Sequence, residues 1–342
     1  MKNSITKTSV SIIIPNWNGA DLLQAYLPSV EKACKNYHGD TELIVVDDAS
    51  KDDSLPVLKR CFPEVRVVRH EFNQGFGKAC GSGAKSAIHP YIVFLNSDIA
   101  VDPNFIAPLI QPFDNPSVFA VSPLIFNEDG SPVDVTITTP YLQRGKIRFK
   151  PPRLEHLQTG TDSLPYPWHT LFPLGGAFAV DRGRFLELEG FDPLFEPFYY
   201  EDTDLGFRAW RRGWTCVVAP ESRVIHFHNG AIARSFKYFR IKVIAKRNRL
   251  LFLWKNLTTP ALFRQHMIFH FLRLLYAPFK LNGLVIIATL LAFPKLPAAM
   301  QRRAKEKEAA VFSEKEIFAA IRTANTANCK AIESEKSSAQ GE

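Results

Sequence analysis

The chain has 342 residues and a formal net charge of +8 at pH 7, with 46% hydrophobic and 22% charged residues. This balance excludes a disordered chain and fits a globular protein of one large or two smaller domains. Its five cysteines are widely spaced, odd in number and without a CxxC pair. They argue against a disulfide-stapled secreted scaffold or a zinc ribbon and favour a reducing cytoplasm.

The first ninety residues or so alternate between short apolar runs and helical patterns. An apolar β-branched run at residues 10–15 is broken by Pro15 and Asn16, so it predicts a strand and not a signal peptide. The further predicted strands cover residues 42–48, 65–70 and 91–98. Helical spacing is found over residues 19–34, 50–60 (with Ser50 as a possible N-cap) and 75–88. This alternation predicts an α/β fold with a mostly parallel central sheet flanked by helices.

After residue 98 the regularity fades. Pro and Phe are frequent between residues 102 and 197, and residues 140–167 are expected to form a long loop able to close over a site. An aromatic turn from residue 195 leads into a helix predicted to start near Thr203. Residues 224–230 are predicted to be a strand with His226 and His228 on one face.

Polar side chains end three of the predicted strands. They are Asn16 and Asn18, Asp47 and Asp48, and Asn96 and Asp98. Ligands of open parallel sheets bind beyond the carboxyl ends of the strands, and acids gathered there must be hydrated, paired or bound to a cation. A single such residue is often only a strand-end cap. Three ends together favour a binding site.

Seven ordered blocks carry a resemblance to a known family. The blocks are IPNWN, VVDDASKDDS, NQGFGKACGSG, FLNSD, LGGAF, EDTDLGFRAWRRGW and VIHFHNG. In this order they resemble the family 2 glycosyltransferases, and most of all the branch of bacterial rhamnosyltransferases and related enzymes of cell-surface polysaccharide assembly. The resemblance covers residues 10–230 and, more loosely, continues to residue 248. It implies a GT-A (Rossmann-like) fold, a nucleotide-sugar donor, a divalent metal and inversion at the anomeric carbon.

The metal site implied by the resemblance departs from the family pattern. The family motif is D-x-D, but this chain has Asn96-Ser97-Asp98, so an amide replaces the first carboxylate. We expect Asp98 to be a metal ligand and His226 to complete the shell, with His228 as the alternative to His226. A mixed carboxylate and imidazole shell favours Mn²⁺ over Mg²⁺. For either histidine, the structural alternative is a buried, hydrogen-bonded strand residue.

The donor is expected to lie along the polar strand ends. We expect Asp48 to accept from the N3–H of uracil or thymine, and Asp47 to cap the next segment. Two glycines of the LGGAF block are expected to let the backbone approach the donor sugar. The predicted donor-binding residues are Pro15, Asn16, Asn18, Asp47, Asp48, Asn73, Gly75, Phe76, Asn96, Gly175 and Gly176.

The catalytic carboxylate is expected in the Glu201-Asp202 pair. Inverting transfer needs one general base to deprotonate the acceptor hydroxyl, and we assign this role to Asp202 with Glu201 beside it. Acids at a helix N-terminus also stabilise the helix dipole, which is the structural alternative. The three arginines that follow, Arg208, Arg211 and Arg212, are expected on a solvated helical face or, alternatively, near the diphosphate.

Positive charge is concentrated toward the C-terminal end. Residues 231–307 contain sixteen Lys or Arg and one acid, Glu306, so the rest of the chain is acidic overall. The longest apolar run there, residues 281–293, is shorter than the roughly 20 residues that a spanning helix needs. We therefore expect basic amphipathic helices lying on an anionic membrane surface. The alternative is a set of helices packed beneath the catalytic domain.

These patterns predict a GT-A domain over residues 1–230, a basic helical region over 231–325 and a disordered tail over 326–342. The predicted function is inverting, metal-dependent transfer of a sugar, rhamnose for example, from a uridine or thymidine diphosphate sugar. The expected acceptor is a hydroxyl of a glycan or lipid-linked acceptor at the inner face of the cytoplasmic membrane, and no nucleic-acid partner is expected. The alternatives are a sugar nucleotidyltransferase, which would want a Gly-rich basic loop after the first strand, and a non-catalytic membrane-associated partner.

Overall fold

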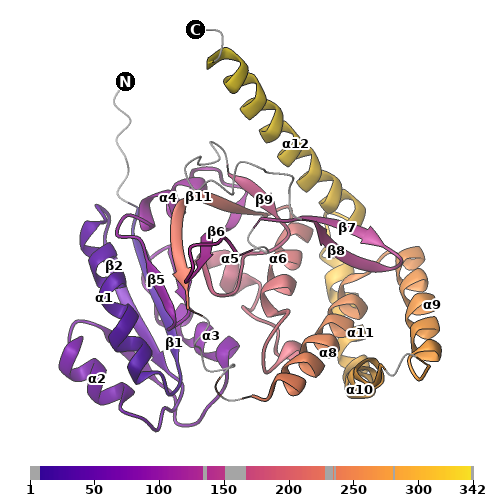
Figure 1. Ribbon diagram of the computed structural model, residues 1–342, viewed down its shortest axis with the longest axis horizontal. Helices are drawn as coiled ribbons and strands as arrows, with labels where there is room; N and C mark the ends of the chain where they lie inside the picture. The colour runs from indigo at the N-terminus through magenta and orange to yellow at the C-terminus, as the bar shows by residue number, and fades with distance from the viewer. Residues whose placement is uncertain are drawn as a thin grey trace.

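The computed structural model describes residues 8–133, 137–150, 167–227, 234, 236–279 and 282–339, with side chains up to residue 328 (Figure 1). The strands are β1 Val10–Asn16, β2 Thr41–Asp47, β3 Arg66–Arg69, β4 Tyr91–Leu95, β5 Ile99–Val101, β6 Val118–Asn127, β7 Thr139–Gln143, β8 Lys146–Lys150, β9 Trp168–Thr170, β10 Ala177–Asp181 and β11 Thr215–His226. The helices of the first 230 residues are α1 Ala20–Asn36, α2 Ser54–Cys61, α3 Phe76–Ser86, α4 Ile106–Ile110, α5 Arg182–Glu187 and α6 Glu201–Arg211, with short 3₁₀ turns η1 Gln111–Asp114 and η3 Pro193–Phe195. The remaining helices are α8 Tyr238–Asn256, α9 Pro260–Tyr276, α10 Gly283–Ala292, α11 Leu296–Glu308 and α12 Glu314–Ala339, with η4 Phe293–Lys295 between α10 and α11.

Among the described residues, nine strands form one mixed sheet in the order β3-β2-β1-β4-β10-β6-β11-β5, with β9 also paired to β11. The first four strands are parallel, as predicted. The rest of the sheet is mixed, because β10 runs antiparallel to both β4 and β6 whereas β11 is parallel to β6. The carboxyl ends of β1, β2 and β4 therefore meet at one edge of the sheet.

The strands are buried on both faces, which is why they are near-continuous apolar runs. In β1, Ile13 packs into the core cluster that includes α3, α5 and α6, whereas Ile12 and Ile14 pack into the cluster on the α1 side. Helix α3 approaches the sheet closely at Gly83, where a Cβ would lie 2.4 Å from Ile13 and 3.1 Å from Val46. Only glycine fits that contact.

The structure corrects three expectations about local structure. Residues 139–150 form the β7-β8 hairpin, where the sequence predicted part of a long loop, and residues 151–166 lie outside the described residues. The N-cap of α2 is Asp53 and not Ser50. Helix α12 continues to Ala339, where a disordered tail was predicted after residue 325.

The C-terminal helices share the core of the sheet domain. Figure 1 shows α8, α10 and α11 lying against the same side of the molecule as α6, with α9 outermost and α12 extending away from the body. Apolar residues of α8, including Leu251 and Phe252, belong to the same buried cluster as Phe94 and Phe207. Ile317 and Phe318 of α12 join it too. The residues from 238 onward therefore complete the hydrophobic core.

A buried ion network fixes α6 to these helices. Asp204 accepts from Arg208 Nε at 2.7 Å, from Lys255 Nζ at 2.8 Å and from Asn256 Nδ2 at 2.9 Å. Lys255 Nζ also donates to Asp192 at 2.7 Å. Burial alone would raise the pKa of Asp204, but Lys255 and Arg208 outweigh burial and hold that pKa below its usual range.

The arginines of α6 differ from the prediction of a solvated face. Arg208 is 4% exposed and Arg211 is 0% exposed. Arg211 Nη2 donates to Thr258 Oγ1 at 3.0 Å and lies 3.3 Å from the Glu314 carboxylate. These two arginines serve the packing of α6, and they are not free to neutralise a diphosphate.

One helical run in the described part of the chain, Gly283–Glu308, is long and apolar enough to cross a membrane by length and composition alone. Its most apolar window has a mean hydropathy of 1.8, and 22% of that window is buried within the protein. The apolar run considered in the sequence is shorter because it stops at Phe293, whereas the helix continues through η4 into α11.

Candidate active site

Strained backbone marks the edge of the sheet where the polar strand ends gather. Asn18 and Ala49, which follow β1 and β2, have φ values of 51° and 61°. Tyr199 and Tyr200, which directly precede α6, have φ values of 71° and 76°. Non-glycine residues rarely adopt the left-handed region, and such strain concentrates at functional sites because the surrounding structure must enforce it.

The ends of β1 and β2 are tied together by side chains. Asn16 is 2% exposed, and its Nδ2 donates to Ser54 Oγ at 3.0 Å. Asp47 accepts from the backbone N–H of Ser50 at 3.2 Å, as expected for a residue that caps the next segment. Asn18 Oδ1 accepts from Lys51 N at 2.8 Å. Asn16, Asn18 and Asp47 therefore shape the strand-end loops, and their contact with a donor stays a prediction.

Asp48 organises the loop that leads into α3. Its Oδ1 accepts from the backbone N–H of Gln74 at 2.8 Å and contacts His70 Nδ1 at 2.7 Å, while its Oδ2 accepts from Gly75 N at 2.7 Å. Gly75 has a φ of 85°, so glycine suits the turn before α3. With three partners present, a carboxylate retains one acceptor position, on Oδ2. The predicted contact with a uracil or thymine base stays a prediction.

Asp98 and His226 lie side by side although 128 positions separate them in the sequence. β5 pairs antiparallel with the end of β11, with Ile99 opposite His226. This pairing places His226 Nε2 3.2 Å from Asp98 Oδ1, with the Asp98 side chain 4% and the His226 side chain 19% exposed. A carboxylate oxygen and an imidazole nitrogen at this separation make a donor pair suited to a divalent transition metal.

The described residues contain no cluster of three His, Cys, Asp or Glu side chains placed to hold a metal ion. His228, the alternative to His226, lies outside the described residues. Asp98 and His226 are thus the protein donors that the structure brings together, and a bound ion would need further oxygen ligands from solvent or substrate. Such an open shell is typical of catalytic metal sites.

Gly175 and Gly176 connect this pair to the predicted general base. A Cβ on Gly176 would lie 3.6 Å from the His226 ring, and Gly176 O accepts from Asn96 N at 2.9 Å. The neighbouring Gly175 N–H donates to Asp202 Oδ2 at 3.0 Å. The two-glycine segment therefore contacts His226, the partner of Asp98, at one residue and Asp202 at the other, and a shared site for the two carboxylates stays a prediction.

Glu201 and Asp202 differ in how their carboxylates are held. Asp202 Oδ1 accepts from the N–H of Thr203 at 2.6 Å and from its hydroxyl at 3.1 Å. Glu201 Oε2 is buried and has no hydrogen-bond partner within the described part of the chain. Burial, reinforced by the charge of Asp202, raises the pKa of Glu201 to about 8. Burial also raises the pKa of Asp202, although its hydrogen bonds to Thr203 and Gly175 oppose the shift.

Asn248 of α8 holds the strained loop before this pair, a role that the sequence analysis missed. The side chain is fully buried, and its Nδ2 donates to Phe198 O at 2.8 Å, to Tyr199 O at 3.0 Å and also to Phe195 O. The only sequence signal was a polar residue on the buried side of an otherwise apolar helical pattern. The acceptors lie some fifty positions earlier, so no local pattern could identify them.

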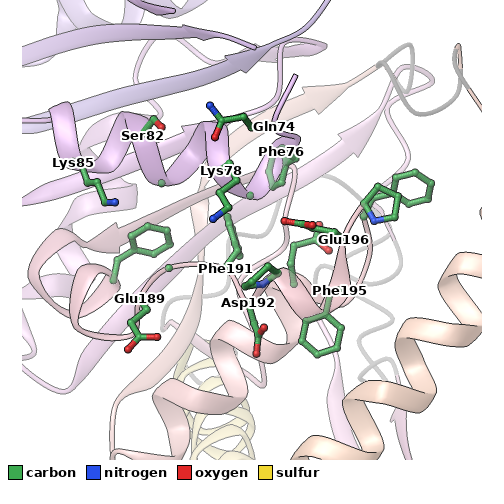
Figure 2. Close-up of a pocket in the computed structure, with 18 of the residues that line it drawn as sticks. Gln74, Phe76, Lys78, Ser82, Lys85, Glu189, Phe191, Asp192, Phe195 and Glu196 are labelled. Atoms are coloured by element: carbon green, nitrogen blue, oxygen red, sulfur yellow. The ribbon is translucent and has the colours of Figure 1, made fainter. Parts of the chain in front are cut away.

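A cavity of about 600 Å³ opens beside Glu201, between α3 and the segment from α5 to α6. Figure 2 shows Phe76 and Lys78 extending from α3 toward the segment that carries Phe191 and Asp192. Phe76 packs on Phe191 with ring centroids 5.7 Å apart. The cavity combines aromatic walls with charged side chains, a mixture suited to a sugar ring with its apolar faces and hydroxyl rim.

Two predicted donor residues have no hydrogen bond or ring contact in the described structure that ties them to this site. Asn73 is exposed, and Pro15 is partly exposed at the end of β1. Their roles stay predictions.

Comparison with known proteins identifies the family. A family model described as "Glycosyl transferase family 2" matches residues 11–182. N-acetylgalactosaminyltransferase 7 of Drosophila melanogaster is 27% identical over 248 residues, 68% of this chain and 41% of the relative. Polypeptide N-acetylgalactosaminyltransferase 16 of Homo sapiens is 27% identical over 229 residues, 66% of this chain and 40% of the relative. The chain thus spans about two fifths of the length of these relatives.

Solved structures share the fold. A crystal structure of GalNAc-T7 with UDP, GalNAc and Mn²⁺ matches with a TM-score of 0.57 at 21% identity, covering 74% of this chain and 49% of that one. The mannosyltransferase PcManGT from Pyrobaculum calidifontis, in complex with GDP-Man and Mn²⁺, matches with a TM-score of 0.52 at 17% identity over 94% of this chain and 84% of that one. The family match spans half of the sequence and includes the ends of β1, β2 and β4. The chain belongs to glycosyl transferase family 2.

Proposed function

We propose that this protein is an inverting, metal-dependent glycosyltransferase that uses a nucleotide diphosphate sugar. The observation that carries the proposal is that Gly175 bonds the Asp202 carboxylate while the adjacent Gly176 lies against His226, which contacts Asp98. A metal-binding pair and a carboxylate base around one backbone segment are what a single-displacement transfer requires.

Asp98 and His226 would hold the divalent ion, which when bound supplies Lewis-acid stabilisation of the departing diphosphate. Mn²⁺ suits this mixed donor pair, and it is also the ion named for the GalNAc-T7 and PcManGT structures. Gly175 and Gly176 leave room for the donor sugar to approach the backbone. The remaining acceptor position on Asp48 Oδ2 is where the N3–H of a pyrimidine base would bind.

Asp202 is the proposed general base. Its Oδ1 is held by Thr203 and its Oδ2 by Gly175 N–H, so the carboxylate is fixed in orientation before the acceptor arrives. Burial raises its pKa, which strengthens it as a proton acceptor. Inversion follows because one base deprotonates the acceptor hydroxyl, which then attacks the anomeric carbon opposite the leaving group.

Glu201 is proposed to act on the acceptor in its protonated form. With a pKa raised to about 8 by burial, its carboxyl group carries a proton at neutral pH and can donate a hydrogen bond into the cavity that it lines. The cavity beside Glu201 is accordingly the proposed acceptor site. A glycan or a lipid-linked sugar is the proposed acceptor class, and the exposed apolar and basic surface of the C-terminal helices supports action at the cytoplasmic face of a membrane.

The experiment is a donor screen by thermal shift with and without Mn²⁺. The candidates are dTDP-rhamnose and UDP sugars from the sequence prediction, and UDP-GalNAc and GDP-mannose from the relatives. A donor that binds the folded state raises the melting temperature by mass action. Release of a nucleoside diphosphate from the stabilising donor supports transfer. Release of inorganic pyrophosphate from a sugar phosphate and a nucleoside triphosphate would instead favour the nucleotidyltransferase alternative.

A further inference from the structure

A group of five cations lies beside the candidate active site and takes no part in the proposed chemistry. This basic cluster consists of Lys146 and Arg148 on β8, Lys246 and Arg249 on α8, and Arg273 on α9. Arg148 is exposed, and the other four side chains are partly exposed. The hairpin strand β8 lies almost ninety residues before the consecutive helices α8 and α9, so the cluster is a product of the fold.

The three elements are held together by direct contacts. Arg249 Nη2 donates to Ile147 O at 3.2 Å, which joins α8 to the hairpin. His266 Nδ1 lies 2.8 Å from Gly145 O, which joins the turn of the hairpin to α9. In Figure 1 the β7-β8 hairpin accordingly crosses above α8 and ends beside α9.

No acid among the described residues forms an ion pair with the basic cluster. The ion pairs of the described residues are all formed by side chains outside the cluster. By contrast, Arg208 and Lys255 of the nearby core are each paired with an acid. Burial, together with the charges of Arg273, Arg249, Arg148 and Lys246, lowers the pKa of Lys146 to about 8. Like charges this close repel one another, so the fold maintains the cluster against an electrostatic penalty.

The location of the basic cluster connects it to the substrate. Arg249 is close enough to Tyr200 to influence the pKa of that phenol, and Tyr200 directly precedes Glu201. Arg249 also follows Asn248, which holds the loop before the catalytic pair. The cluster thus lies next to Tyr200 and the loop that leads into the catalytic pair.

An apolar surface adjoins the basic cluster. Helices α9 and α10 and the η4 turn expose large apolar side chains, which include Ile268, Phe271, Leu275, Tyr276, Leu290 and Phe293. Soluble surfaces seldom expose so many large apolar groups together. Cations next to such a surface match a molecule with an anionic head and an apolar body.

We propose that the basic cluster binds a phosphoryl group, carried either by a lipid-linked acceptor or by the headgroups of an anionic bilayer. Arginine guanidinium groups bind phosphate oxygens through paired hydrogen bonds, and lysine adds point charge. Binding of a phosphate would relieve the mutual repulsion of the five cations. The identification with an acceptor rests on the proposed transferase function, but the binding of a phosphoryl group does not.

The test measures binding without donor and in the presence of EDTA, so that neither catalysis nor a metal-held diphosphate contributes. The first probe is inorganic pyrophosphate, and its binding is measured by calorimetry. The second is sedimentation with phosphatidylcholine vesicles that contain either phosphatidylglycerol or a polyprenyl phosphate. The double variant Arg148→Gln/Arg273→Gln removes two cations whose side chains make no hydrogen bond to the described residues, and Lys246→Gln tests the cluster from α8. The matched control is Lys35→Gln/Lys59→Gln, which removes two exposed charges from α1 and α2.

We expect the cluster variants to weaken binding at least about tenfold while the control binds as wild type. Loss for pyrophosphate and polyprenyl phosphate vesicles assigns the site to an acceptor phosphate, and loss confined to phosphatidylglycerol vesicles assigns it to the bilayer. The melting temperature of the double variant should stay level or rise, because repulsion is removed. Wild-type binding of every probe by the cluster variants, or equal weakening by the control, would overturn the proposal.

Discussion

The N–H of Gly175 donates to the Asp202 carboxylate at 3.0 Å. This contact brings a helix N-terminus and the turn before β10 to within one hydrogen bond of each other. Because Gly176 lies against His226, the same two residues set the distance between the base and the metal-binding pair. The reactive geometry thus depends on a short backbone segment, and the segment can be tested directly.

Replacing Gly175 with alanine should impair transfer far more than the same change at Gly176. A Cβ on Gly175 would lie 3.0 Å from Asp202 Oδ2, whereas one on Gly176 would make ordinary contacts of 3.5 Å or more with Ile99 and His226. A displacement of the base can lower kcat by roughly 100-fold. Steady-state kinetics on both variants make the comparison, and Gly176→Ala is the matched control. Wild-type kcat in Gly175→Ala would contradict the role given to this contact.

Asn248 should affect both stability and turnover. Asn248→Ala removes the amide that holds three backbone carbonyls and should lower the free energy of unfolding by about 2–3 kcal/mol. Because two of these carbonyls belong to the strained loop before Glu201, kcat should fall as well. Asn325→Ala is a matched control, since Asn325 is also buried and bridges the backbone of His169 away from the site. Urea denaturation and kinetics together test this, and equal kcat in the two variants would argue against positioning by Asn248.

The pH dependence of Glu201→Gln should separate the two adjacent acids. Burial raises the pKa of Glu201 to about 8, so glutamine mimics the form present at neutral pH, and turnover at pH 7 should be retained. The acid limb of kcat/KM, set by Asp202, should stay in place. Above pH 8 the wild type gains a second negative charge and the variant does not, so their profiles should diverge there. An acid limb near pH 8 that vanishes in Glu201→Gln would transfer the role of base to Glu201.

Asp204 should stabilise the fold at neutral pH and lose that effect in acid. Its folded pKa lies below the unfolded value of 3.8, so its contribution is complete above that value and disappears as the pH falls through the folded pKa. Asp204→Asn removes the buried carboxylate that Lys255 and Arg208 contact. This change should lower the free energy of unfolding by about 3–5 kcal/mol. Chemical denaturation at pH 7 and at pH values below 3.8 measures both effects. A variant as stable as wild type at pH 7 would refute this account of the network.

The sequence predicts the parts of the site that local pattern controls. Apolar runs ending in Asn16, Asp47 and Asp98 identify strand ends, because parallel strands buried on both faces must be apolar until they reach the edge of the sheet. The role of Asp47 as a cap was confirmed for the same local reason. The position of His226 beside Asp98 was expected only from the family resemblance, since the pairing of β5 with β11 is not encoded locally.

What the sequence could not predict depends on contacts between distant segments. The arginines at 208 and 211 follow the polar spacing of a solvated face, and only the helices after residue 238 bury them. The basic cluster shows the same limit, because about a hundred positions separate its β8 members from those on α8 and α9. The antiparallel position of β10 between β4 and β6 was not predicted. The apolar pattern of a buried strand does not indicate whether the strand runs parallel or antiparallel to its neighbours.

Calorimetric titration of the stabilising donor, with and without Mn²⁺, into Asp98→Ala and Asp202→Asn is the most direct test of a shared site. Each titration is paired with an assay of transfer. We expect Asp202→Asn to bind the donor nearly as tightly as wild type in Mn²⁺ while losing turnover, and Asp98→Ala to lose the Mn²⁺-dependent part of binding. Retained turnover in Asp202→Asn, or unchanged Mn²⁺-stimulated binding in Asp98→Ala, would contradict the account.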